Sequence, residues 1–73
     1  MKNCVIAISS LTYAIKAEKI LNACDIRCNI VKLGVGQTKR GCAYGIRLDY
    51  INSQNAYAQL EKNAIPAGEM IFV

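Results

Sequence analysis

The sequence contains four cysteine thiols, and Cys42 has the surroundings best suited to chemistry. It follows Gly41 at the end of a glycine-containing stretch, and the basic residues Lys39 and Arg40 lie just before it. The thiolate is the reactive form of cysteine, and neighbouring cations favour that form. We therefore predict that Cys42 is a reactive thiol, with Arg47 as a further supporting cation.

The same residues also have a plainer interpretation. Cys42 has the strand parity of Tyr44 and Ile46, so it could instead pack at the end of the core. Arg47 could be a solvated charge on the opposite strand face, and the pair Lys39 and Arg40 could be a solvated loop. Because free cysteine often behaves as a small hydrophobe, local features leave both interpretations open.

The other three cysteines have less reactive surroundings. Cys4 and Cys24 lie in apolar periodic segments and are predicted to be core residues, whereas Cys28 is predicted to be partly exposed on an edge strand. No secretion signal precedes the first apolar segment, so we expect free thiols in the reducing cytoplasm.

The composition argues against several other kinds of site. The chain has no histidine, which excludes histidine-based catalysis and ligation, and its five acidic residues are scattered. Residues 34–36 lack the later glycine and the helix of a dinucleotide site. Cys24 and Cys28 straddle a helix end and a strand start, which is a poor arrangement for a metal pair. We expect no metal and no cofactor.

The charge and hydropathy patterns restrict the partners. A net charge of +4 weakly favours acidic partners, but Lys39 and Arg40 form the only basic pair, with Tyr44 as the nearest aromatic residue. A nucleic-acid partner is therefore not expected. No apolar run approaches the roughly 20 residues that a membrane span needs, so no membrane partner is expected either.

Hydrophobic periodicity predicts six elements in one domain, 1–73. Strands are predicted at 3–8, 27–33, 42–48 and 69–73, with the first strand central and the second at an edge. One helix is predicted at 11–24, with Asp25 ending it. A second helix is predicted to start within residues 49–53 and to be stopped by Pro66. This βαββαβ order indicates an α+β, ferredoxin-like fold, in which two helices cover one face of a four-stranded antiparallel sheet.

The apolar stripes of the two predicted helices identify the rest of the core. The first stripe comprises Ala14, Ala17, Leu21 and Cys24, and the second comprises Ala56, Leu60 and Ala64.

Three segments resemble a known family of small bacterial domains, the putative selenium/sulfur carrier protein-like family. Residues 41–48, with Gly41, Cys42 and Arg47, resemble its Gly-Cys-Gly-Leu-Ala-Leu-Arg-Phe stretch. Residues 14–21 resemble its first helix, and residues 60–65 resemble the end of its second. The sequence departs from the family pattern at Ala43, where the family has glycine, and in a more basic loop before Cys42.

The resemblance implies that Cys42 holds sulfur or selenium and that Gly41 shapes the approach to it. Such a protein is a stoichiometric carrier and not an enzyme, and its partners are a donor enzyme and an acceptor protein.

Two alternatives remain at this stage. The first is a small regulatory module that binds a protein or ligand, in which Cys42 is structural. The second is a redox-responsive thiol, with Cys42 pairing to Cys28 or to a second protomer. Exposed sheet edges in so small a domain also make a homodimer plausible.

Overall fold

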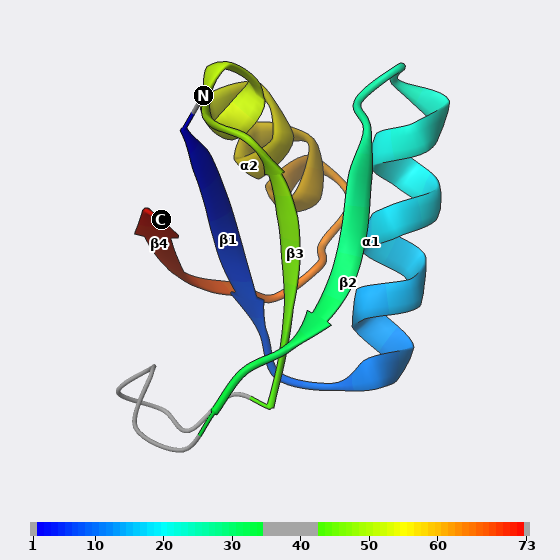
Figure 1. Cartoon of the computed structure of the whole chain (residues 1–73). Helices are drawn as coiled ribbons and strands as arrows, with labels where there is room; N and C mark the ends of the chain where they lie inside the picture. The colour runs from blue at the N-terminus through cyan, green and yellow to red at the C-terminus, as the bar shows by residue number, and fades with distance from the viewer. Residues whose placement is uncertain (1, 35–42, 73) are drawn as a thin grey trace.

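The computed structural model describes residues 2–34 and 43–72. Two α-helices, one 3₁₀ helix (η1) and four strands follow one another along this part of the chain (Figure 1). They are β1 (Asn3–Ile8), α1 (Leu11–Ala23), β2 (Cys28–Lys32), β3 (Tyr44–Asp49), η1 (Tyr50–Asn52), α2 (Ser53–Lys62) and β4 (Ala67–Phe72).

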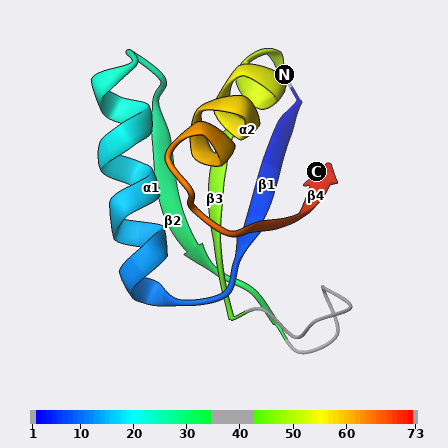
Figure 2. The ribbon, with the colours of Figure 1, turned by 180° about the vertical axis from the view of Figure 1, so that it is seen from behind.

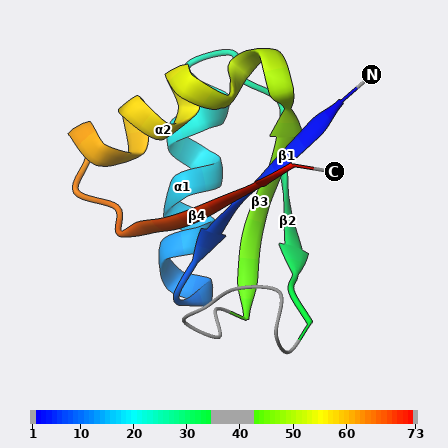
Figure 3. The same cartoon turned by 90° about the vertical axis from the view of Figure 1, so that its left-hand side faces the viewer.

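The four strands form one antiparallel sheet in the order β2-β3-β1-β4. Both helices lie on the same face of this sheet, as Figure 2 and the side view in Figure 3 show. The predicted βαββαβ, ferredoxin-like α+β arrangement is therefore confirmed. So are the central position of β1, which lies between β3 and β4, and the edge position of β2.

The core lies between the sheet and the helices. Alternate residues of β1 and β3 point into it, as period-two alternation predicts, and the helices contribute small or branched side chains. Its most deeply buried members are Cys4, Ile6, Ile8, Ala14, Ala17, Leu21, Ile46, Ala56 and Leu60.

Both α-helices end in the same backbone motif. After α1, the N–H of Ile26 donates to the carbonyl of Leu21 at 2.9 Å, and Asp25 adopts a left-handed φ of 61°. After α2, the N–H of Ile65 donates to the carbonyl of Leu60, also at 2.9 Å. This is the Schellman motif, and in each case the isoleucine that follows the left-handed residue is buried.

Two predicted core residues are not in the core, for the same physical reason. Cys24 is the C-cap of α1 and is exposed. Ala64 follows the C-cap of α2, has a φ of 59° and is exposed. Because the chain has already left the helix at both positions, neither side chain continues the apolar stripe.

Element boundaries also differ from the predicted ones. The second helix is preceded by η1, and α2 proper begins at Ser53 and ends at Lys62, before Pro66. Strand β4 begins at Ala67, two residues earlier than predicted, and its register against β1 shifts between Ile6 and Ile8.

Neither of the described α-helices has the length and apolar character that crossing a membrane requires.

Candidate functional site

Most of the predicted site residues lie outside the described residues. This applies to Cys42, Gly41, Lys39 and Arg40, so their predicted roles stay predictions. The structure does describe the strand ends on either side of this segment, and it describes Arg47.

The strand ends beside the segment are joined by backbone pairing. Lys32, the last residue of β2, lies opposite Tyr44, the first residue of β3. One residue further, the N–H of Leu33 donates to the carbonyl of Ala43 at 2.8 Å. The antiparallel ladder therefore continues past the strand ends, and the positions of Leu33 and Ala43 are fixed relative to each other.

Side chains on the helix-free face of the sheet brace this junction. Gly45 is buried, and a Cβ atom added to it would lie 2.5 Å from Cγ1 of Val5 and 3.4 Å from Cδ1 of Leu33. The absence of a side chain at Gly45 therefore lets Val5 and Leu33 lie over β3. This contact anchors the end of β2 to the centre of the sheet.

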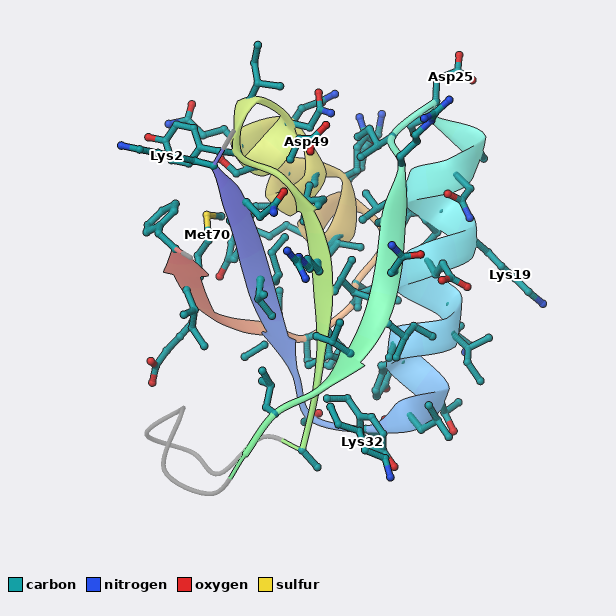
Figure 4. All side chains as sticks on the ribbon, in the orientation of Figure 1. Lys2, Lys19, Asp25, Lys32, Asp49 and Met70 are labelled. Carbon is teal, nitrogen blue, oxygen red and sulfur yellow. The ribbon has the colours of Figure 1, made fainter. Side chains whose placement is uncertain are left out.

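Lys32 is a cation at this junction whose position was not predicted from the sequence. It is exposed, and Figure 4 shows it at the opposite end of the sheet from Asp25 and Asp49. The strand pairing places Lys32 opposite Tyr44, at the end of β3 next to residues 35–42. The sequence alone does not show this, because Lys32 and Tyr44 are far apart along the chain.

Arg47 is exposed on β3, opposite Val5 of β1 and Asn29 of β2. It lies on the helix-free face, as its predicted alternation with Ile46 and Leu48 requires. Arg47 lines a surface recess, and the other described residues that line it include Asn3, Arg27, Asn29 and Asp49. Arg47 is thus placed with residues at the end of the sheet away from Lys32.

The three described cysteines have different surroundings. Cys4 is fully buried in β1, and burial raises the pKa of its thiol above the ordinary value of 9.0. Cys28 is half-buried, and its thiol lies 3.9 Å from the carbonyl of Glu18 and 3.9 Å from Oδ1 of Asn22. Burial, followed by the nearby Glu18 carboxylate, raises the pKa of the Cys28 thiol.

These surroundings oppose thiolate formation at Cys4 and Cys28, since both favour the neutral thiol. The predicted partial exposure of Cys28 is confirmed, and so is the core position of Cys4. Cys24 is exposed, contrary to its predicted core position. Within residues 2–34 and 43–72, no cluster of three or more potential metal ligands occurs.

Cys28 lies opposite Leu48, at the other end of the β2–β3 ladder from Lys32 and Tyr44. The proposed pairing of Cys28 with Cys42 stays a prediction, because Cys42 lies outside the described residues.

Comparison with known proteins identifies a family. A family model described as "Putative Se/S carrier protein-like" matches residues 3–71. No curated protein and no solved structure matches the chain significantly. The matched range begins at the first residue of β1 and ends one residue before the end of β4, so it extends over all the described helices and strands except Phe72.

Proposed function

The chain belongs to the "Putative Se/S carrier protein-like" family, and on this basis we propose that it carries a sulfur or selenium atom on Cys42. The family match over residues 3–71 is the observation that supports the proposal most strongly. The carrier is stoichiometric: it receives the atom from a donor enzyme, passes it to an acceptor protein and returns to the free thiol.

The transfer step follows from thiolate chemistry. The Cys42 thiolate attacks the terminal sulfur of a persulfide on the donor, a bond forms between the two sulfur atoms, and the donor's sulfur–sulfur bond breaks. The electron pair leaves with the donor thiolate, so the exchange needs no external oxidant or reductant. Selenium transfers in the same way and leaves a selenosulfide on Cys42.

The described residues support this assignment in two ways. First, the thiols of Cys4 and Cys28 are poor candidates, since burial raises the pKa of both. Second, the segment that contains Cys42 connects two paired strand ends, with the exposed cation Lys32 at one of them. A cation near a thiol favours the thiolate, and Lys39, Arg40 and Lys32 are the proposed sources of that charge.

Intact-mass analysis after incubation with a cysteine desulfurase and cysteine tests the proposal. The wild-type protein should gain one sulfur atom, and Cys42→Ser should gain none. Cys24→Ser is the matched control, because Cys24 is an exposed thiol that the proposal does not use, and this variant should load like the wild type.

A selenocysteine lyase with selenocysteine provides the corresponding test for selenium. If the wild-type protein gains neither atom, or if Cys42→Ser gains as much as the wild type, the carrier proposal is wrong.

A further inference from the structure

A surface recess of about 500 Å³ lies at the end of the sheet where β1 begins, β2 begins and β3 ends. Polar residues of all three strands and of the turn before β2 line it. They include Asn3, Arg27, Asn29, Arg47 and Asp49. Asp49, labelled in Figure 4, marks this end of the sheet, opposite to Lys32.

The strand register brings the polar side chains of the recess into two adjacent rows. Asn29 and Arg47 face each other in one row, and Asp49 faces Asn3 in the next. Arg27 directly precedes Cys28, which pairs with Leu48, so Arg27 lies beside Asp49 and diagonal to Arg47. Diagonal neighbours in an antiparallel pair are about 7–8 Å apart. At this separation, two long arginine side chains can both contact the same ligand.

The two guanidinium groups have no partner among the described residues. Arg27 and Arg47 are both exposed, and neither forms an ion pair or a hydrogen bond with another described side chain. Asp49 is the only acidic residue among the described residues that line the recess, so these residues carry an excess of one positive charge. The side-chain amides of Asn3 and Asn29 supply further hydrogen-bond donors.

We propose that this recess binds a small organic molecule through a carboxylate or phosphate oxyanion, held by Arg27 and Arg47. The planar guanidinium donates two parallel hydrogen bonds to such groups, which makes arginine their preferred partner. The volume lies within the range of roughly 300–1,000 Å³ that is typical of small-molecule sites, which leaves room for an organic portion beyond the anion. This site is separate from the proposed role of Cys42.

Titration with two probes, pyrophosphate and citrate, followed by amide NMR at low salt, tests this site. At least one probe should produce saturable shifts at residues of the recess. Arg27→Ala and Arg47→Ala should each weaken that binding about tenfold, because each removes a charge-assisted pair of hydrogen bonds. Asp49→Asn should strengthen it about two- to threefold by removing the opposing charge. Tighter binding of pyrophosphate would identify a phosphate ligand, and tighter binding of citrate would identify a carboxylate ligand.

Lys19→Ala is the matched control, because it removes one positive charge from the exposed surface of α1, where Figure 4 shows the side chain extending away from the sheet. It should leave the affinity nearly unchanged. If neither probe causes saturable shifts, or if Lys19→Ala weakens binding as much as the two arginine variants, the proposal is wrong. Sulfur loading of Cys42 is a different measurement, so the failure of either proposal leaves the other intact.

Discussion

The Cγ1 methyl group of Val5 occupies the space that a side chain at Gly45 would need. A Cβ atom at Gly45 would lie 2.5 Å from that methyl and 3.3 Å from the carbonyl oxygen of Ile6. Leu33 also packs over Gly45. The packing of Val5 and Leu33 at Gly45 therefore connects the centre of the sheet to the strand end that precedes residues 35–42.

Gly45→Ala should therefore lower the free energy of unfolding by about 1–3 kcal/mol, the usual cost of inserting a methyl group into a closely packed position. Chemical denaturation measures this change. If the loss is caused by the clash with Val5, the double variant Val5→Ala/Gly45→Ala should lose less stability than the sum of the two single changes. Strict additivity would contradict this explanation.

Replacing Ala64 by glycine should stabilise the protein. Ala64 has a φ of 59°, and a left-handed conformation costs a residue with a side chain about 1–2 kcal/mol. Glycine carries no such steric cost but loses more entropy on folding, so Ala64→Gly should raise the free energy of unfolding by about 0.5–1 kcal/mol. Thermal or urea denaturation measures the change.

Ala58→Gly provides the control for this experiment, since it is the same substitution at an exposed position inside α2. There, glycine should destabilise the protein by about 1 kcal/mol. Equal effects of the two substitutions would show that the backbone conformation at Ala64 does not decide the outcome.

Features that depend on a short stretch of sequence were predicted correctly, whereas features that depend on the backbone conformation or on contacts between distant segments were not. The burial of Ile46 and Leu48 on the same face of β3 was predictable, because the alternation of side chains along a strand is visible in the sequence. The position of Ala64 was not, because an apolar residue at the expected spacing does not reveal that the backbone has already left the helix. The diagonal placement of Arg27 and Arg47 follows from the register between two strands, which no short segment of sequence encodes.

The three described thiols should react with an alkylating reagent at different rates. Cys24 should react fastest, since it is exposed, and Cys28 should react more slowly, since it is half-buried and its pKa is raised. Cys4 should react only when the chain unfolds, because it is fully buried. Mass spectrometry of digested samples at successive times gives the three rates.

Cys24 then serves as the internal reference for Cys42. A carrier thiol whose thiolate is favoured by nearby cations should be alkylated faster than Cys24 at neutral pH. A rate for Cys42 as slow as that of Cys4 would instead favour the interpretation that Cys42 is a packing residue.

Alkaline pH should destabilise the protein partly through Cys28. Because burial and Glu18 raise its pKa in the folded state, the unfolded chain releases the thiol proton first as the pH rises. The stability contributed by the neutral thiol is therefore complete below pH 9.0, its ordinary pKa, and is lost as the pH rises through the higher folded-state value. Removing the titrating group with Cys28→Ala should make the decline of stability above pH 9.0 shallower.

Urea denaturation at a series of pH values measures the difference between the wild type and Cys28→Ala. Cys24→Ala, at an exposed position, serves as the control. Parallel pH profiles for Cys28→Ala and the wild type would contradict the raised pKa of Cys28.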